Sequence, residues 1–178
     1  MPHPPISPDL HAALERGAAA CAGLFDTPTL GGLGRVRMCR LAGFPDDGLV
    51  PGDDMTASLV LPVHGPTAAT AVLSFEPEAA FHLIRSAAGE PQGEPLERFA
   101  ALGQAMAERI LAELFGEPAH LGTIRLEEDG VVPTVLGTHA PRETALLCAE
   151  LVLADEESAV GGVFYLLTDR KDPSSQDA

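Results

Sequence analysis

The chain has 178 residues, of which 46% are apolar, and 26 acidic against 11 basic residues give it a formal net charge of −15. This length is enough for one domain with a substantial core, and the acidic balance argues against nucleic-acid binding and against an anionic membrane surface. We expect a cytoplasmic protein, because the sequence shows neither a signal peptide nor an apolar run of membrane-spanning length.

The cysteines and histidines do not predict a metal site. Cys21, Cys39 and Cys148 each lie in an apolar stretch, and three is an odd number. Such a pattern favours buried reduced thiols over disulfides or metal ligands. The six histidines show no close ligand pairing beyond His3 and His11.

Two long amphipathic helices are predicted. The first runs from about Pro8 to Phe25, and its proline suits the first turn, where a missing N–H costs nothing. The second runs from Pro95 to Gly116, where the glycine and the following Pro118 stop it. Its apolar stripe comprises Leu96, Phe99, Gly103, Met106, Ile110 and Leu114.

The opposite face of the second helix carries the candidate functional residues. They are Glu97, Ala101, Gln104 and Glu108, at i, i+4, i+7 and i+11. A solvated face whose charges confer solubility is the simpler interpretation, and a docking or catalytic face is the alternative. Under the alternative, the small residues Ala101 and Gly103 would let a partner approach closely.

The remaining segments predict a largely antiparallel sheet. Strands are expected at 30–41, 55–63, 67–75, 120–126, 131–137, 144–153 and 161–168. A short helix should begin at Pro77 and end at Gly89, with an apolar side formed by Ala80, Phe81, Ile84 and Ala88. The lead 1–7 should be flexible and the polar tail 169–178 disordered, which leaves a single α+β domain over 8–168.

A weak internal repeat relates the two halves. Residues 22–28 (AGLFDTP) resemble residues 112–118 (AELFGEP), an offset of 90. The same offset places the hairpin 55–75 on the hairpin 145–167. Each half would then supply one long helix, one extended segment and one hairpin. The sheet would have pseudo-two-fold symmetry, with both long helices packed on one side of it.

Three stretches follow one another in a recognisable order: 56–89, a hairpin with a following helix; 101–107 (ALGQAMA); and 132–137 (VPTVLG). In this order they resemble the CheC/CheX/FliY family of chemotaxis phosphatases, and its CheX type most closely. The family's signature helix has an acid or Ser, then Glu four residues on, then Asn three further. The matching residues here are Glu97, Ala101 and Gln104. The resemblance implies a CheX-like fold over about 10–168.

The resemblance also implies a reaction. The family's substrate is a phosphorylated aspartate on the receiver domain of a response regulator such as CheY, and the receiver supplies the Mg²⁺. This chain would then need no cofactor of its own. Gln104 would place the attacking water, because Gln has the same carboxamide atoms as the family's Asn. Ala101 lacks the carboxylate that binds the receiver's Lys, so Glu97 or Glu108 would have to dock the receiver.

Three functions therefore stay open. The first is a CheX-like phosphatase of a phosphorylated receiver, in chemotaxis or in another two-component pathway. The second is a binding module of the same fold that docks receivers through the Glu97–Glu108 face without hydrolysis. The third is a homodimerisation domain, in which the apolar hairpin 144–168 would join two sheets edge to edge.

Overall fold

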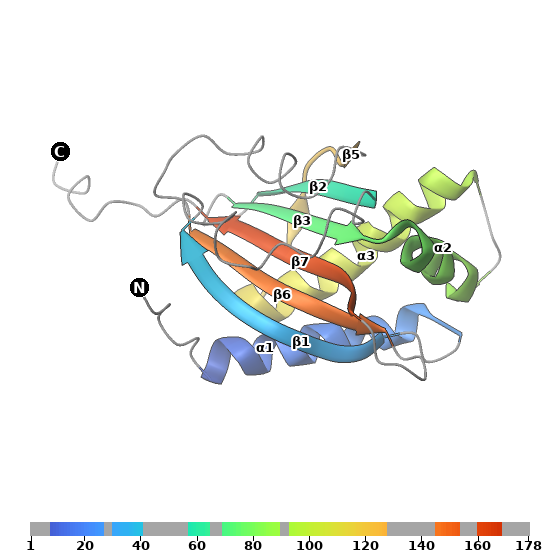
Figure 1. The fold of residues 1–178 in the computed structure, drawn as a ribbon. Coiled ribbons are helices and arrows are strands. Elements are labelled where there is room, and N and C mark those ends of the chain that lie inside the picture. The colour runs from blue at the N-terminus through green and yellow to red at the C-terminus, as the bar shows by residue number, and fades with distance from the viewer. Residues whose placement is uncertain are drawn as a thin grey trace, which may run out of the picture.

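One antiparallel sheet carries the two long helices on one side (Figure 1). The structure is a computed structural model, and it describes residues 8–26, 30–40, 57–64, 69–89, 93–127, 145–153 and 160–168. The helices are α1 (Pro8–Ala20), the 3-10 turn η1 (Cys21–Leu24), α2 (Pro77–Ser86) and α3 (Pro95–Phe115). The strands are β1 (Leu30–Arg40), β2 (Ala57–His64), β3 (Ala69–Phe75), β4 (His120–Leu121), β5 (Arg125–Glu127), β6 (Ala145–Leu153) and β7 (Val160–Thr168). The predictions for 1–7, 131–137 and 169–178 lie outside these described residues.

The strand order is β1-β6-β7-β3-β2-β4, with β5 also paired to β2, and every pair is antiparallel. In the predicted repeat β2 corresponds to β6, β3 to β7, and β1 to the β4–β5 segment. If each strand is replaced by its counterpart in the other half, the strand order becomes the same order read from the opposite edge of the sheet. A pseudo-two-fold repeat requires this relation. The predicted α+β class is confirmed, and the repeat itself stays a prediction from the sequence.

The hairpin β6–β7 lies inside the sheet. β6 pairs with β1 and β7, and β7 pairs with β6 and β3. Both strands thus have neighbours on either edge, so the expected edge-to-edge dimer through residues 144–168 is wrong. The apolar sequence that suggested this role reflects burial on both faces of the sheet. The edges of the described sheet are β1 on one side and β4 and β5 on the other. The homodimer stays a prediction.

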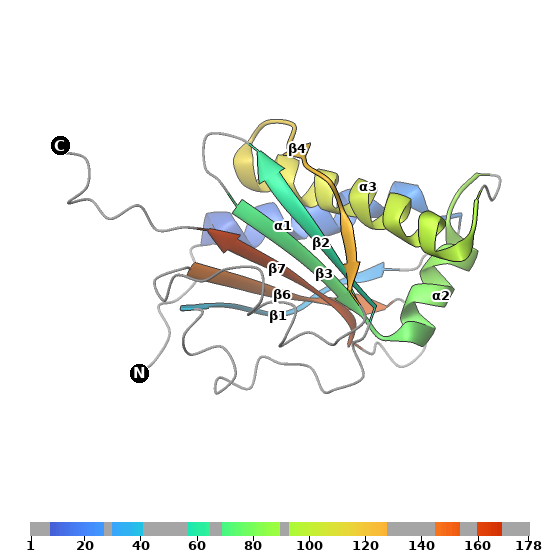
Figure 2. The same cartoon turned by 90° about the horizontal axis from the view of Figure 1, so that it is seen from above.

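The two long helices lie side by side on one face of the sheet (Figure 2). Gly17 permits their close approach, because a Cβ there would lie 2.8 Å from the Cα of Ile110. Arg109 of α3 donates from Nη1 to the carbonyl of Ala20 at 2.5 Å, which satisfies an acceptor at the end of α1. The chain then continues into η1, so the regular helix ends before the predicted Phe25.

Two large apolar residues expected in the core are exposed. Phe99 is buried, as predicted, with 3% of its surface exposed. Leu96 belongs to the same stripe but is 58% exposed, because it lies in the first turn of α3 and lines an open pocket. In α2 the core side is formed by Ala79, Ala80, Leu83 and Ile84. Phe81 is 56% exposed, and Ala88 lies exposed beyond the helix end. No helix in the described parts of the chain has the length and hydrophobicity to cross a bilayer.

Candidate functional site

The outward face of α3 carries the four candidate residues, and we call Glu97, Ala101, Gln104 and Glu108 the α3 ridge. Glu97, Ala101 and Glu108 are exposed and Gln104 is half-buried. The helix is held at both ends. Pro95 occupies its first turn, and Gly116 closes it with a φ of 72° and an N–H that donates to the carbonyl of Ala112 at 2.9 Å. The α3 ridge therefore lies on a regular helix with defined ends, and a partner can reach its exposed residues.

Two residues of the α3 ridge contact each other. Gln104 donates from Nε2 to Oε1 of Glu108 at 3.0 Å, one helical turn further along. A carboxylate without a proton only accepts hydrogen bonds, so the nitrogen of the carboxamide faces Glu108 and its oxygen points away from Glu108. The i, i+4 spacing in the sequence was the signal for this pair.

Glu97 stands apart from that pair. It lies at the third position of α3, and its Oε2 would be 2.6 Å from a Cβ built on Gly93. The carboxylate is thus turned back over the start of the helix, where the helix dipole favours a negative charge. Gln104 lies seven positions further along the helix, about 10 Å along the axis. The structure therefore joins Gln104 to Glu108 and leaves Glu97 separate.

Gly103 does not belong to the exposed face. It is buried, and a Cβ there would collide with the Cδ1 atom of Leu59 on β2. Its small size serves the packing of α3 on the sheet, so the expectation that it eases a partner's approach is wrong. Of the two small residues proposed for that role, Ala101 alone is exposed.

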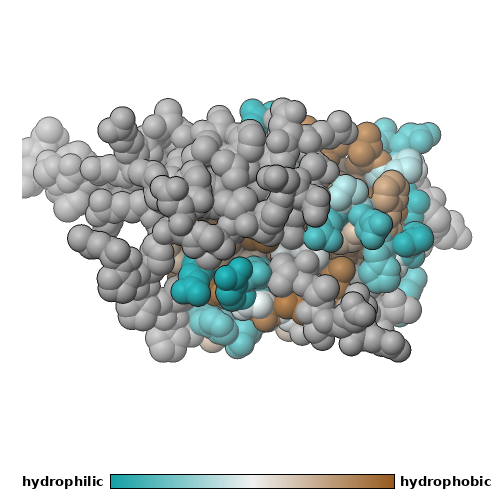
Figure 3. Space-filling model, viewed as in Figure 1, coloured by the Kyte–Doolittle hydropathy of each residue, from teal (hydrophilic) through white to brown (hydrophobic). Residues whose placement is uncertain are grey.

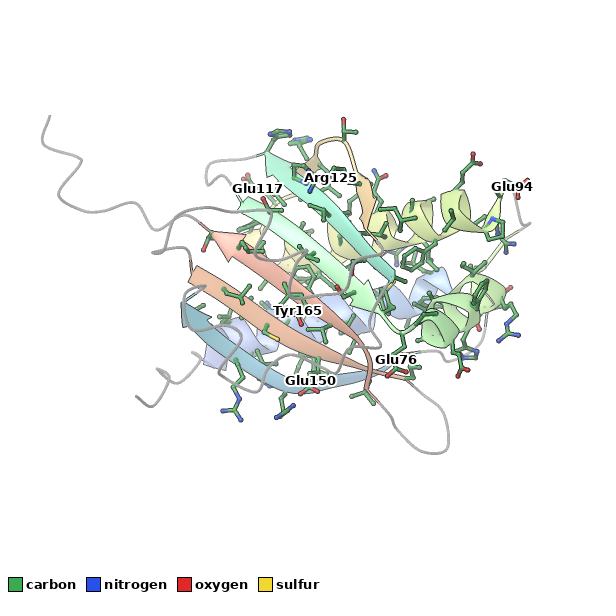
Figure 4. All side chains as sticks on the ribbon, turned by 45° about the horizontal axis from the view of Figure 1, so that its top comes forward. Glu76, Glu94, Glu117, Arg125, Glu150 and Tyr165 are labelled. Carbon is green, nitrogen blue, oxygen red and sulfur yellow. The ribbon has the colours of Figure 1, made fainter. Side chains whose placement is uncertain are left out.

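An apolar pocket of about 420 Å³ lies beside the start of α3. Its lining is Ala57, Pro77, Ala80, Phe81, Ile84, Pro95, Leu96, Phe99 and Leu126. Brown apolar surface lies among teal residues on the side of the molecule where α2 and the start of α3 lie (Figure 3). Figure 4 shows Glu94 at this end of α3, projecting away from the sheet. Sequence reasoning missed the pocket because it assigned Leu96 and Phe81 to the core.

No metal site was predicted. Within the described ranges, no three His, Cys, Asp or Glu side chains are grouped as metal ligands would be.

No protein-family model and no curated protein sequence matches this chain. Solved structures do match. A chain of the CheX–CheY–BeF3–Mg²⁺ complex from Borrelia burgdorferi gives a TM-score of 0.56 at 10% identity, over 90% of this chain and 97% of that one. This chain has the CheX/FliM fold. A chain of the FliG–FliM complex from H. pylori gives a TM-score of 0.60 at 15% identity, over 92% of this chain and 94% of that one. FliY from Thermotoga maritima gives 0.57 at 12% identity, over 91% and 90%.

The CheX/FliM fold agrees with the resemblance read from the sequence. At these identities the likeness concerns the fold alone. One of these solved structures is a complex of CheX with CheY, and another is a complex of FliG with FliM.

Proposed function

We propose that this protein is a CheX-like phosphatase, which hydrolyses the phospho-aspartate of a response-regulator receiver domain. The observation that carries the proposal is Gln104, a partly exposed carboxamide on the outward face of α3 whose NH2 group is held by Glu108. It occupies the position where the CheX-type signature has its Asn. The shared fold of a CheX that was crystallised with CheY supports the same assignment. The proposal includes a cytoplasmic location for the protein, as expected from the sequence.

Gln104 would act by positioning. Its Oε1 would accept a hydrogen bond from a water molecule and hold that water in line with the phosphorus atom. The water oxygen forms a new bond to phosphorus, and the bond from phosphorus to the aspartate oxygen breaks. The products are inorganic phosphate and a free carboxylate on the receiver. The Mg²⁺ that neutralises the phosphoryl charge would belong to the receiver.

Docking would rely on the acids of the α3 ridge. A Lys of the receiver would meet Glu97 or Glu108, because Ala101 has no carboxylate to offer. The absence of that charge-assisted contact would weaken docking by about 1.5–3 kcal/mol relative to a signature with Glu. We therefore expect a phosphatase that needs higher concentrations than one with the full signature.

The test uses receiver domains encoded in the same genome, phosphorylated with acetyl phosphate in the presence of Mg²⁺. Phosphate release is followed with and without the protein. We expect faster release from at least one receiver, and loss of that acceleration with Gln104→Ala. Glu117→Gln is the matched control, since Glu117 is exposed beyond the end of α3. Unchanged release from every receiver would overturn the proposal.

A second candidate is a binding module without catalysis, and the alanine at position 101 is the observation that favours it. This function predicts a stable complex with a beryllofluoride-activated receiver and no faster hydrolysis. Glu97→Lys and Gln104→Arg should abolish the complex. If both variants bind like the wild type, the α3 ridge is not the docking site.

A further inference from the structure

We infer that Glu108 is a positioning residue, which orients the Gln104 carboxamide for the attacking water. This inference rests on the proposed function and assigns a specific task to one acid of the α3 ridge. The hydrogen bond from Gln104 Nε2 to Glu108 Oε1 at 3.0 Å carries it.

A glutamine needs such an anchor more than an asparagine does. Its side chain has one more rotatable bond, and the final torsion of a carboxamide is broad and roughly two-fold. The two orientations present either the oxygen or the NH2 group to a water molecule, and only the oxygen accepts a hydrogen bond. Because the carboxylate of Glu108 accepts from the NH2 group, it selects the orientation in which Oε1 points away from Glu108.

Glu108 is the one residue of α3 placed to do this. Helix neighbours of Gln104 lie three or four positions away, and the other three are Ala100, Ala101 and Ala107. None of these alanines has a side-chain acceptor. Glu97 is two turns away and is turned toward Gly93. The docking charge would then fall to Glu97, while Glu108 controls the geometry of the reacting water.

Two substitutions separate positioning from charge. Glu108→Ala removes both the acceptor and the charge, whereas Glu108→Gln keeps an oxygen that can accept from Gln104 and removes only the charge. A positioning residue should therefore be rescued by glutamine. If Glu108 acts as a docking charge, both variants should lose activity equally.

The experiment measures phosphate release from an acetyl-phosphate-treated receiver over a range of receiver concentrations, so that kcat and KM are obtained separately. We expect Glu108→Ala to lower kcat about three- to ten-fold with KM within about two-fold. This fall in kcat exceeds what the loss of an exposed side-chain hydrogen bond costs in the free protein, because docking of the receiver removes the water that competes for that bond. Glu108→Gln should keep kcat within about two-fold of wild type. Glu97→Gln should raise KM instead, and Glu117→Gln should change neither constant.

A second readout does not depend on activity. The side-chain NH2 resonances of Gln104 in a ¹⁵N-correlated NMR spectrum should shift and sharpen in Glu108→Ala and stay near wild type in Glu108→Gln. Circular dichroism melts check that each variant is folded.

The outcomes separate the two proposals. An unchanged kcat in Glu108→Ala, or an equal rise of KM in both Glu108 variants, would overturn the inference while leaving the phosphatase in place. No acceleration by the wild type with any receiver would overturn the proposed function, and the positioning role with it.

Discussion

The Cα of Ile110 lies 2.8 Å from the position that a Cβ on Gly17 would occupy. The backbones of α1 and α3 are thus in near contact at this point. The contact buries the inner side of α3, including Met106 and Ile110, and leaves the α3 ridge facing solvent. The position of the candidate site therefore depends on a residue of the first helix that has no side chain.

Gly17→Ala should destabilise the protein by about 1–3 kcal/mol, because the added methyl meets backbone atoms that cannot rotate away. Alanine is the better helix former by roughly 1 kcal/mol, so propensity alone would give the opposite sign. Urea unfolding measures the change. The control is Ala19→Gly on the exposed side of α1, which reports the propensity difference alone. A stabilised Gly17→Ala variant would show that the helices can separate at little cost.

Ser58 and Ser74 form a buried hydroxyl pair across β2 and β3, with oxygens 2.8 Å apart. Either single change to alanine leaves the other hydroxyl without this partner and should cost about 1–3 kcal/mol. The double variant should cost less than the sum of the two single changes. A double-mutant cycle by urea unfolding measures the coupling, and additive effects would contradict it.

Cys21 should make the protein sensitive to alkaline pH. Burial raises the pKa of its thiol from the ordinary 9.0 to about 12, although the nearby charge of Arg109 opposes the shift. The unfolded chain loses this proton above about pH 9 while the folded protein keeps it, so stability falls from there until about pH 12. At pH 10 the loss should be about 1 kcal/mol.

The measurement for Cys21 is the difference between wild type and Cys21→Ala in urea unfolding at pH 8 and pH 10. Other groups titrate equally in both proteins, so the comparison isolates the thiol. In the folded protein Cys21 should also react slowly with thiol reagents at pH 8, because the thiolate is the nucleophile. An equal loss of stability in both proteins at pH 10 would contradict the prediction.

Leu96→Ala and Phe99→Ala should differ sharply, although both residues belong to one apolar stripe. Phe99 is buried and packs edge-to-face on Phe75, with ring centroids 5.8 Å apart, so its loss should cost about 3–5 kcal/mol. Leu96 is mostly exposed at the pocket rim, so Leu96→Ala should lower the free energy of unfolding by less than about 1 kcal/mol. Thermal and urea unfolding measure both, and similar costs would mean that the pocket is closed in solution.

Ala101→Glu should strengthen the proposed docking of a receiver. The position is exposed on the α3 ridge, so the longer side chain can be accommodated. A charge-assisted contact with a receiver Lys should lower KM about ten-fold or more, against a small penalty from the like charge of Glu97 four residues before it. Ala101→Gln is the neutral control. An unchanged KM would mean that the receiver docks elsewhere or in another orientation.

Local features were predictable from the sequence because they depend on periods within one segment. The 3.6-residue period placed Glu97, Ala101, Gln104 and Glu108 on one face of α3, and the start at Pro95 and the stop at Gly116 agree with the structure. The period-2 pattern and the turn residues predicted the hairpins β2–β3 and β6–β7. The α+β class and the CheX-like resemblance follow from the order of these elements.

The tertiary structure decided what covers each face, because periodicity says which side a residue occupies and nothing about its neighbours. Gly103 meets Leu59, a contact between segments more than forty residues apart, and is therefore buried. Leu96 and Phe81 border a pocket, since no other described element packs over them. The hairpin β6–β7 is interior because β1 pairs beyond it. By itself the sequence determined the elements and the residues of the α3 ridge. The packing of distant segments determined that this ridge is free and that the β6–β7 hairpin is not, because those contacts form only when the whole chain folds.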